Sequence, residues 1–404
     1  MSATRAGGDG GRKRVLFLAH RVPYPPDKGD KIRSYREMRV LAEAADLTVG
    51  CFFDPRLEGG AVEELRRLCP DLVALPLAET SGKARALAAM AGRGPLSLAY
   101  YRSTAMARAL GERGPFDAAL AFSSTMGPYL EGVDARRRVM DLCDLDSEKW
   151  SQYAACSRWP MSFVYRVEAR RLGAYERALA SRVDATVLVS RAEADDLRRA
   201  CPGSAIEVVP NGIDLDYYDP EAVDASGDGR TLVFCGAMDY RSNVDAVLWF
   251  HEAILPRVRR EVPDARFRIV GSNPAPEVRR LGESEGVEVT GRVPDVRPHL
   301  LGAAVSVAPL RMGRGVPNKV LEALALALPL VATPRAVAGL ALDAFEATEV
   351  AEEPEAFAAA AVRRLQAARN GSGRHPGNRR LLEERYSWER SMETLRGIVL
   401  PEAS

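Results

Sequence analysis

Short apolar runs alternate with helical segments along most of the chain, and this alternation constrains the fold more than any other feature. Residues 14–20 form a nearly continuous apolar run, as expected of a strand buried on both faces of a sheet. Helical spacing of apolar residues predicts a helix from Asp30 to about Ala44, and residues 47–53 predict the next strand. A strand, a helix and a second strand at this spacing form a βαβ unit, so we expect a parallel sheet.

The alternation occurs as two successive series. We expect the first to end with a strand at 206–210 and the second to begin with a strand at 231–236, with the polar, turn-rich residues 219–230 as a linker. A chain of 404 residues, 47% of them hydrophobic, is long enough for two globular domains. The other predicted helices are 61–68, 104–111, 161–182, 191–200, 243–260, 355–369, 378–384 and 388–399, and the other strands are 72–75, 117–122, 138–141, 183–190, 266–271, 287–291, 304–309 and 330–333.

These series predict an α/β protein with two doubly wound parallel-sheet domains. Asn211 and Gly212 form a strong turn signal, and their place between the two series suits a hinge as well as a simple turn. We place the first domain at 14–212 and the second at 213–388, and we interpret the glycine-rich, basic residues 1–13 as a disordered leader. Ligands of such domains lie beyond the carboxyl ends of the strands, so the expected site is a cleft between the domains.

Charge and cysteine content narrow the class of protein. Fifty-six basic residues against fifty-five acidic residues give a net charge of +1, which argues against a dedicated nucleic-acid binder. The six cysteines include no CxxC pair and no His-rich neighbourhood, so we expect buried, reduced thiols rather than disulfides or a zinc site. No uninterrupted apolar span is long enough to cross a bilayer. We therefore expect a cytoplasmic protein and leave open a peripheral contact with the inner face of the membrane.

The segment 309–334 contains a glycine loop, a helix and a short apolar strand. Two glycines flank Arg314, and we expect Pro317 to occupy the first position of a helix that runs to about Leu328. Free N–H groups at the start of a helix attract anions, and phosphate groups commonly bind there.

Two charged residues strengthen this interpretation. Lys319 adds positive charge to the site, and Glu322 shares a helix face with Lys319, where a carboxylate can accept hydrogen bonds from sugar hydroxyls. The alternative is an ordinary capped surface helix with an ion pair between these two residues. The loop taken alone does not separate the two interpretations.

Glycine or proline follows four strands of the second series, at Gly236, Gly271, Gly291 and Pro309. Glycine lets a backbone approach a ligand closely, although each glycine taken alone is more simply a turn. Their recurrence at one expected edge of one sheet favours a ligand site that faces the loop at Arg314.

Several of these segments resemble the GT-B glycosyltransferases of family 4. The resemblance lies in Val209–Asp214 (VPNGID), Lys319–Ala325 (KVLEALA) and Leu328–Ala332 (LPLVA), and it extends over residues 14–398. Further residues resemble the sugar transferases of bacterial exopolysaccharide (PEP-CTERM/EpsH-type) clusters: His20–Arg33, Asp141–Trp150, Gly236–Tyr240 with Asn243, and Asn318–Glu322.

The resemblance implies a GT-B fold, in which two Rossmann-like domains face each other across a cleft and the C-terminal domain holds the nucleotide sugar. It implies that Glu322 binds the donor ribose, that Lys319 lies near the diphosphate, and that the last helix crosses back so that residues 389–404 pack on the first domain. Arg292 and Val293 match a segment that touches the nucleobase. The donor-binding residues expected from these arguments are Gly29, Gly236, Arg241, Arg292, Val293, Gly315, Val316, Asn318, Lys319 and Glu322.

Two positions depart from the family's common pattern. The first glutamate of its usual Glu-x7-Glu pair is replaced by Arg314, and the usual Arg/Lys pair after the first strand of the second domain is not obvious, Arg241 being the nearest candidate. These departures leave the contact with the donor sugar open, whereas a cation at 314 keeps phosphate binding intact.

The expected catalytic residues are Asp141, Arg314 and Lys319. Cleavage of the sugar–diphosphate bond develops negative charge on the leaving phosphate, which the two cations and a helix N-terminus can stabilise without a metal. In the resemblance, Asp141 falls near a position that often carries a histidine facing the sugar, so it can orient the acceptor hydroxyl or take up its proton. A structural carboxylate at a strand end is the alternative.

Further groups of residues have both a structural and a functional interpretation. Asp144 and Asp146 imitate an Asp-x-Asp metal pair, but in an acidic loop we expect them to cap a helix or to form hydrogen bonds. After the first strand, Gly29 is a functional candidate, whereas its charged neighbours are expected to be solvated. An aromatic group between arginines could stack on sugars or touch a membrane, although core packing of a long helix is favoured; it comprises Trp150, Tyr153, Trp159, Phe163 and Tyr165.

Together these observations predict a retaining, metal-independent glycosyltransferase. It would move a sugar from a UDP- or GDP-linked donor to a glycan or lipid-linked acceptor in exopolysaccharide biosynthesis, and retention is implied by the resemblance alone. Two other classes remain open: a nucleotide-sugar epimerase of the same fold and a non-catalytic scaffold of a polysaccharide assembly complex. A dinucleotide oxidoreductase is disfavoured because no strand is followed by GxGxxG.

Overall fold

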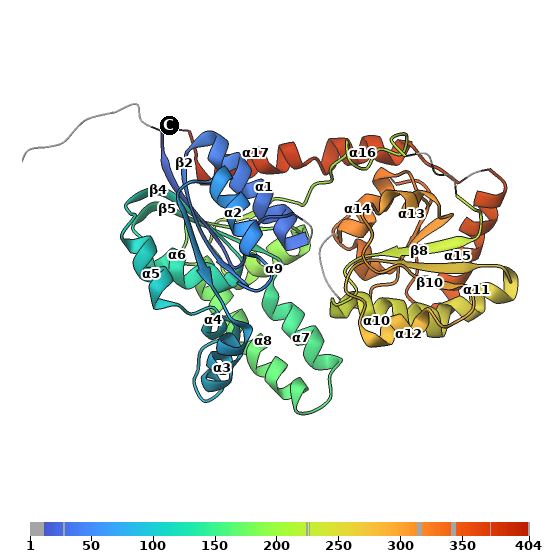
Figure 1. Cartoon of the computed structure of the whole chain (residues 1–404), viewed down its shortest axis with the longest axis horizontal. Coiled ribbons are helices and arrows are strands. Elements are labelled where there is room, and N and C mark those ends of the chain that lie inside the picture. Colours follow the sequence, from blue (N-terminus) through green and yellow to red (C-terminus); the bar gives the residue numbers. More distant parts are fainter. Residues whose placement is uncertain are drawn as a thin grey trace, which may run out of the picture. The chain divides into compact units, whose positions relative to one another are not determined.

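The computed structural model describes residues 12–26, 29–223, 225, 227–312, 317–340, 345–371 and 373–402. The chain forms two compact units (Figure 1). The first unit contains Met1–Leu188, Leu197–Glu207 and Met392–Ser404, and the second contains Val189–Asp196 and Val208–Ser391. Both are α/β structures, as the alternation of strands and helices predicts.

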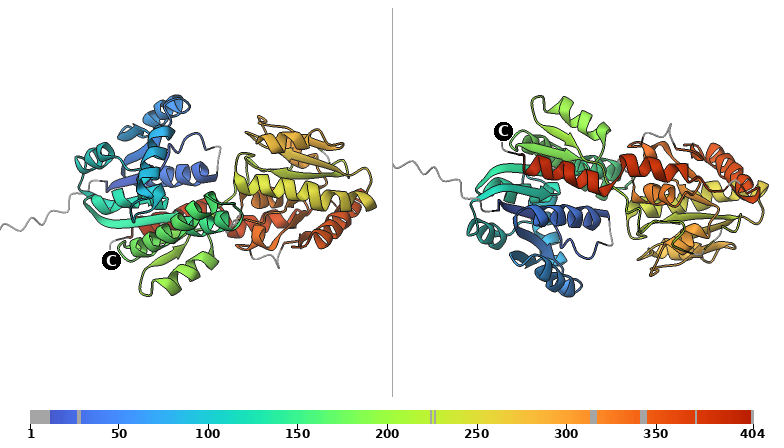
Figure 2. Two further views of the ribbon diagram at one scale, coloured as in Figure 1. Left: turned by 90° about the horizontal axis from the view of Figure 1, so that it is seen from below. Right: turned by 90° about the horizontal axis from the view of Figure 1, so that it is seen from above.

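The first unit is built on a seven-stranded sheet in the order β3-β2-β1-β4-β5-β6-β7. Its interior strand β1 (Arg14–Ala19) pairs in parallel with β2 and β4, and the side chains of Val15 to Ala19 are at most 1% exposed. Helices lie on both faces of the sheet (Figure 2), which explains why these strands are apolar without interruption. The other strands are β2 (Asp46–Phe53), β3 (Leu72–Pro76), β4 (Phe116–Phe122), β5 (Ala135–Cys143), β6 (Ala185–Leu188) and β7 (Ile206–Val208).

The helices of the first unit include four that the sequence patterns did not predict: α3, α4, α6 and α7. The helices are α1 (Gly29–Ala44), α2 (Gly59–Leu68), α3 (Glu79–Ala89), α4 (Leu96–Tyr100), α5 (Thr104–Gly111), η1 (Ser124–Met126), α6 (Gly127–Gly132), α7 (Asp146–Ala155) and α8 (Met161–Ala180). Two more, α9 (Arg191–Ala200) and α17 (Trp388–Val399), contribute residues to both units.

The second unit has a six-stranded sheet in the order β10-β9-β8-β11-β12-β13. All its pairs are parallel, and the strand order reverses direction between β8 and β11, as it does between β1 and β4 in the first unit. Its strands are β8 (Thr231–Cys235), β9 (Arg266–Val270), β10 (Val287–Val289), β11 (Val305–Ala308), β12 (Leu330–Ala332) and β13 (Thr348–Val350). Its helices are α10 (Arg241–Trp249), η2 (Phe250–Ile254), α11 (Leu255–Glu261), α12 (Pro276–Leu281), α13 (Arg297–Leu301), α14 (Asn318–Ala325), η3 (Pro334–Val337), α15 (Pro354–Arg369) and α16 (Gly377–Arg385).

The single helix predicted at 243–260 is divided into three parts, α10, the π-helical segment η2 and α11. Pro256 explains the division, because proline has no N–H to donate to the preceding turn and its ring crowds the carbonyl there. A π turn accommodates this within a continuous helical path.

Residues at both ends of the chain bond to the first unit. Arg12 donates to the carbonyl oxygens of Ala42 and Glu43 in the last turn of α1, and Lys13 donates to the carbonyl of Pro401. Arg137 of β5 donates to the carbonyl of Ile398 at 2.7 Å. Residues 1–11, most of the segment that we interpreted as a leader, lie outside the described residues.

A buried carboxylate joins α8 to the start of α7. Glu176 is 1% exposed, and it accepts hydrogen bonds from the backbone N–H (3.3 Å) and the hydroxyl of Ser147 in the first turn of α7. Burial, together with the nearby charge of Asp146, raises the pKa of Glu176 to about 8 although the bonds from Ser147 oppose the shift.

We therefore expect Glu176 to make the stability of the first unit fall with rising pH. Between the ordinary pKa of 4.5 and about 8, the unfolded chain has lost this proton and the folded chain still holds it. The free energy of unfolding then falls by up to ~1.4 kcal/mol per pH unit. Glu176→Gln should flatten the pH dependence of the urea-unfolding midpoint over this range. Glu64→Gln, at a half-exposed glutamate, is the control. Equal slopes in wild type and Glu176→Gln would contradict the assignment.

Candidate functional site

The candidate site lies at the carboxyl ends of β8 and β11, where the strand order of the second sheet reverses. The chain turns at Gly236 directly after β8 and at Gly271 directly after β9. A Cβ atom on Gly271 would overlap the carbonyl oxygen of Gly236, and one on Gly236 would lie 2.6 Å from the side-chain nitrogen of Asn243. Close packing of these turns therefore requires glycine at both positions.

Helix α14 begins at this edge and is mostly buried. Pro317 does not occupy its first helical position as predicted, because the extended ψ of 135° makes Pro317 the residue that precedes the helix. Pro317 makes no side-chain capping hydrogen bond, and the side chains of Val320, Leu321 and Ala323 are fully buried. Helix α14 is therefore not the capped surface helix of the alternative interpretation.

Lys319, in the first turn of α14, is held against the end of β8. Its Nζ donates to the side-chain oxygen of Asn243 at 3.0 Å and lies 5.1 Å from the centre of the Phe234 ring. Asn243 in turn donates to the carbonyl of Ala237 at 2.9 Å, which fixes its orientation. Burial lowers the pKa of Lys319, and the charge of Glu322 only partly opposes this shift.

Glu322 lies one turn later on α14 and is bonded to Tyr218. Burial raises the pKa of Glu322, whereas the hydrogen bond from the Tyr218 hydroxyl and the charge of Lys319 lower it. The pKa of Tyr218 is raised by burial and by the adjacent carboxylate. Among the described residues Lys319 and Glu322 form no ion pair, so each charge is desolvated without the other as a direct partner.

The remaining predicted donor residues are placed as follows. Arg241 is the first residue of α10 and is half-buried, and Asn318 is the half-buried first residue of α14. Arg292 is exposed, whereas Val293 packs partly against the core of the second unit. Gly29 is exposed at the start of α1 in the first unit. Arg314, Gly315 and Val316 lie outside the described residues.

Next to the predicted nucleobase segment, a small polar cluster orders the chain. Asp295 accepts from the Tyr217 hydroxyl at 3.1 Å and pairs with Arg297 at 2.8 Å. The guanidinium of Arg297 lies 4.2 Å from the centre of the Tyr217 ring. This cluster joins the chain after the Asn-Gly turn to the segment that begins at Gly291.

Sequence patterns did not identify Tyr218 as part of the site, and they included Asn243 only as a motif residue. Tyr218 has no periodic or glycine signal, because it reaches Glu322 through the fold from a position 104 residues earlier in the chain. The place of Asn243 in the first turn of α10, directly after a strand and a glycine turn, is the signal that could have assigned it to the site.

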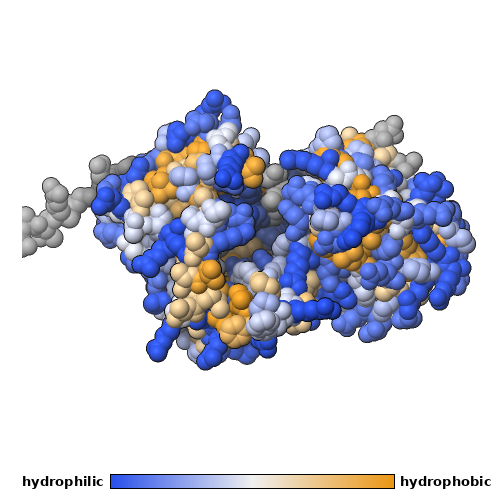
Figure 3. Space-filling view, turned by 60° about the horizontal axis from the view of Figure 1, so that its bottom comes forward, coloured by the Kyte–Doolittle hydropathy of each residue, from blue (hydrophilic) through white to orange (hydrophobic). Residues whose placement is uncertain are grey.

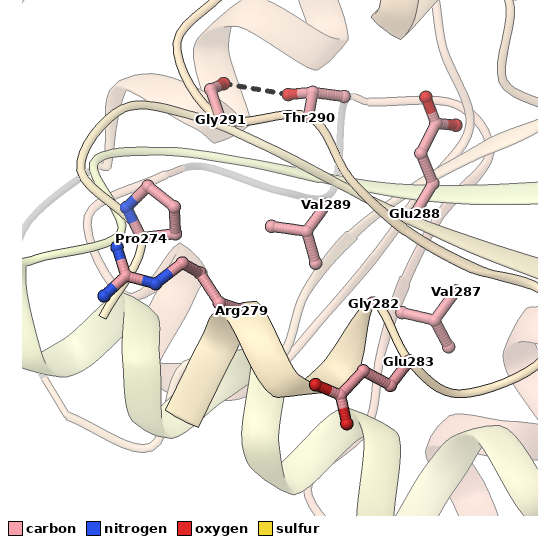
Figure 4. Close-up of a pocket in the computed structure, with 9 residues that line it drawn as sticks. All are labelled: Pro274, Arg279, Gly282, Glu283, Val287, Glu288, Val289, Thr290 and Gly291. Atoms are coloured by element: carbon pink, nitrogen blue, oxygen red, sulfur yellow. Dashed lines mark hydrogen bonds between the residues drawn. The ribbon is translucent and has the colours of Figure 1, made fainter. Parts of the chain in front are cut away.

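An open hollow of about 650 Å³ lies elsewhere in the second unit, between α12 and β10 (Figure 4). Val289 points into the hollow, whereas the carboxylates of Glu283 and Glu288 point away from its centre. Among the described residues of the predicted site segments, only Gly291 lines the hollow. Neither Lys319 nor Glu322 lines it. We therefore do not assign the donor to this hollow.

Asp141, the predicted acceptor-facing residue, is fully buried in the first unit. Its Oδ2 accepts from Nε and Nη2 of Arg33 at 2.9 and 2.6 Å, and its Oδ1 accepts from the backbone N–H of Cys143 at 2.6 Å. Glu37 lies 2.9 Å from Arg33 and is equally buried, and burial together with the charge of Asp141 raises the pKa of Glu37 well above its ordinary value. This placement favours the structural role of Asp141.

Several smaller expectations are corrected by the structure. Lys31 is not solvated but buried, with its Nζ 2.7 Å from Glu58, and Cys156 is exposed rather than buried. Asp146 begins helix α7 and is not part of a loop. Within the described residues, no group of three or more His, Cys, Asp or Glu side chains could hold a metal ion, and no helix is long and apolar enough to cross a membrane.

Two family models match the chain. Residues 229–367 match the family described as Glycosyl transferases group 1, and residues 154–217 match Glycosyltransferase Family 4. Both segments are thus similar to glycosyltransferase domains. The first of these segments contains Lys319, Glu322 and Asn243, so the desolvated charges of α14 lie inside it.

A curated relative is the GDP-mannose-dependent alpha-(1-6)-phosphatidylinositol monomannoside mannosyltransferase of Mycolicibacterium smegmatis. It is 29% identical over 230 residues, which are 51% of this chain and 54% of the relative. The match therefore spans about half the length of the relative.

Solved structures of glycosyltransferases share the fold over nearly the whole chain. Sucrose-phosphate synthase from Thermosynechococcus elongatus has a TM-score of 0.66 at 16% identity, covering 95% of this chain and 97% of that one. Anabaena HepE in complex with UDP and glucose has a TM-score of 0.60 at 13% identity, covering 95% and 98%. The predicted GT-B fold, with two Rossmann-like parallel-sheet domains, is confirmed.

The buried network around Arg33 leads to a stability prediction. Arg33→Met would leave Asp141 buried without its cationic partner, which is expected to cost about 3–5 kcal/mol of unfolding free energy. Arg39→Met is the matched control on the same helix, because Arg39 is 53% exposed and its ion pair is with the exposed Glu43. Its expected cost is below ~1 kcal/mol. Equal urea-unfolding midpoints for the two variants would contradict the role given to the network.

Proposed function

We propose that this protein is a metal-independent glycosyltransferase that takes a sugar from a nucleoside-diphosphate donor bound at α14. The observation that carries the proposal is the placement of two half-buried charges, Lys319 and Glu322, one turn apart on α14 at the carboxyl edge of the second sheet, with Lys319 held by Asn243. Burying charges without direct pairing is costly, and such groups concentrate where a ligand completes their interactions. Their position inside the segment matched by the group 1 family supports this choice.

In this proposal the two charges recognise different parts of the donor. The Nζ of Lys319, held by Asn243, faces the diphosphate and stabilises the negative charge that develops on it as the sugar leaves. The start of α14 adds the partial positive charge of its free N–H groups. Glu322 accepts hydrogen bonds from the ribose hydroxyls, and Tyr218 fixes the orientation of its carboxylate.

The finer features follow from the likenesses and remain proposals. A UDP- or GDP-linked donor fits a nucleotide site of this kind, and the name of the curated relative specifies GDP-mannose for that protein. We propose a retaining reaction and a glycan or lipid-linked acceptor in exopolysaccharide biosynthesis, in the cytoplasm. The residues expected beside the donor phosphates, Arg314 to Val316, belong to the same proposal.

Nucleotide binding tests the proposal directly. Isothermal titration with UDP and with GDP should give a measurable Kd for the wild type with at least one of the two nucleotides. Lys319→Met and Glu322→Gln should each weaken it by about 10-fold or more, since a hydrogen bond to a charged group contributes ~1.5–3 kcal/mol. Lys83→Met, which removes an exposed lysine of the first unit, is the control. Unchanged binding by both α14 variants would show that the donor site is assigned wrongly.

A lipid-linked acceptor would bring the protein to a membrane surface, and the first unit has a suitable exposed group of side chains. The predicted aromatic cluster divides: Trp150 packs against Tyr165 at 5.4 Å between ring centres, whereas Trp159 and Phe163 are 81% and 53% exposed. The expectation of core packing is thus wrong for these two residues. Figure 3 shows hydrophobic groups gathered on this face of the first unit.

The surroundings of this exposed group are basic. Met161 is also exposed, at 45%, and Arg158, Arg166 and Arg170 on the same α7–α8 hairpin are exposed. Apolar side chains that enter the headgroup region, surrounded by arginines that attract anionic lipids, are typical of peripheral membrane contacts.

Vesicle binding tests the proposed membrane contact. The wild type is expected to co-sediment with vesicles containing phosphatidylglycerol more strongly than with neutral phosphatidylcholine vesicles. The double variant Trp159→Ser/Phe163→Ser should lose most of this binding, because it removes the inserted apolar surface. Leu57→Ser is the control, since Leu57 is 83% exposed and lies before α2. Equal sedimentation of the wild type with and without vesicles would rule the contact out.

A further inference from the structure

The first unit has its own polar cluster at the carboxyl edge of its sheet, beside the point where the strand order reverses between β1 and β4. His20 and Arg21 follow β1 directly, and Asp30 lies in the first turn of α1. Neither the family segments nor the proposed donor site includes these residues.

Asp30 is held by two partners and remains accessible. Its Oδ2 lies 3.2 Å from Nη1 of Arg21 and 3.6 Å from Nε2 of His20, and its side chain is 31% exposed. Although burial opposes it, the contacts with His20 and Arg21 hold the pKa of Asp30 well below its ordinary range. The carboxylate therefore stays ionised and is a hydrogen-bond acceptor rather than a base.

His20 is fixed by aromatic neighbours. Its ring stacks on Phe122 and meets the edge of Tyr101, each at 5.8 Å between ring centres. Burial lowers the pKa of His20 although Asp30 opposes the shift, which favours the neutral ring. Its Nδ1 is buried and has no hydrogen-bond partner among the described residues. The ring thus acts as a rigid support for the carboxylate.

The turn of α1 that carries Asp30 is anchored from two sides. Lys31, the next residue, is 6% exposed and pairs with Glu58 at 2.7 Å. Arg33, one turn from Asp30, is fully buried in its pair with Asp141 of β5. Both anchors resist movement of this turn, so the accessible carboxylate is preorganised in position.

The charges of the cluster indicate what it can bind. Arg21 is 41% exposed and already offsets the charge of Asp30. A cation would therefore be repelled by the guanidinium, and an anion would be repelled by the carboxylate. A neutral donor such as a hydroxyl faces neither repulsion, and a hydroxyl bonded to a carboxylate forms a strong, charge-assisted hydrogen bond.

We propose that Asp30, positioned by Arg21 and His20, binds a hydroxyl of the acceptor sugar in the first unit. The inference rests on the proposed function, which requires an acceptor with free hydroxyls. Asp30 recognises and orients the acceptor, and His20 and Arg21 are positioning residues.

Ligand-observed NMR tests the proposal with methyl α-D-mannopyranoside and methyl α-D-glucopyranoside as probes. The wild-type protein should bind at least one of them, and Asp30→Asn should weaken that binding by about 10-fold or more, as expected for loss of a hydrogen bond to a charged group. His20→Gln should weaken it less, because glutamine can still donate to Asp30. Asp117→Asn is the matched control, since Asp117 is 35% exposed at the other end of β4.

The same samples are titrated with UDP and GDP, which separates this inference from the proposed function. Loss of sugar binding in Asp30→Asn with nucleotide binding unchanged is the expected result. Sugar binding that is equal in wild type and Asp30→Asn, or absent from the wild type, overturns the inference. If the sugar binds in a manner that depends on Asp30 but the protein binds no nucleotide, the acceptor site at Asp30 is supported and the proposed donor site is wrong.

Discussion

The hydrogen bond between Lys319 and Asn243 ties a charged side chain of the candidate site to the backbone of the second unit, because Asn243 in turn donates to the carbonyl of Ala237. It places a desolvated ammonium at the end of β8, and it requires the small turn at Gly236, where any side chain would meet the amide of Asn243. Lys319 is half-buried there, and its partial burial lowers the pKa of the ammonium group. Glu322, on the next turn of the same helix, is also half-buried, and burial raises the pKa of its carboxyl group. Within the part of the chain that the structure describes, α14 thus carries two charges that form no ion pair with each other.

Both units use a parallel sheet whose order reverses beside its first strand, and both place polar residues at that edge. Their polar residues are held differently. In the second unit the charges are stabilised by neutral groups, the amide of Asn243 and the hydroxyl of Tyr218. In the first unit, buried ion pairs of Lys31 and Arg33 anchor α1, and these anchors fix the position of the accessible Asp30 carboxylate. In our proposal, the second unit binds the charged phosphates of the donor and the first unit binds a neutral hydroxyl of the acceptor.

Much of the fold follows from local pattern. Continuous apolar runs predicted the central strands of both sheets, and amphipathic spacing predicted α8 within two residues of its observed end at Ala180. Short helices such as α4 (Leu96–Tyr100) were missed because their signal is tertiary: the carboxylate of Glu168, far along the chain, accepts from the N–H of Ser97. A helix end stabilised from a distance leaves no local sequence pattern.

The candidate site, like the fold, was predictable only where its signal is local in the sequence. The helical spacing of Lys319 and Glu322 and the glycine at 236 identified its centre, but the partners that orient both charges come from α10 and from the segment before β8. Burial also decided against one candidate. The sequence predicts Asp141 at the end of a strand and next to an acidic stretch. The structure shows that Arg33 of α1 donates hydrogen bonds to its carboxylate.

The central claim is that α14 binds the donor nucleotide, and a structure of the protein with UDP or GDP bound tests it most directly. The account predicts ribose hydroxyls within hydrogen-bond distance of the Glu322 carboxylate and the diphosphate beside the Nζ of Lys319. A nucleotide bound in the hollow beside β10, or anywhere that leaves both Lys319 and Glu322 without contact, would contradict it.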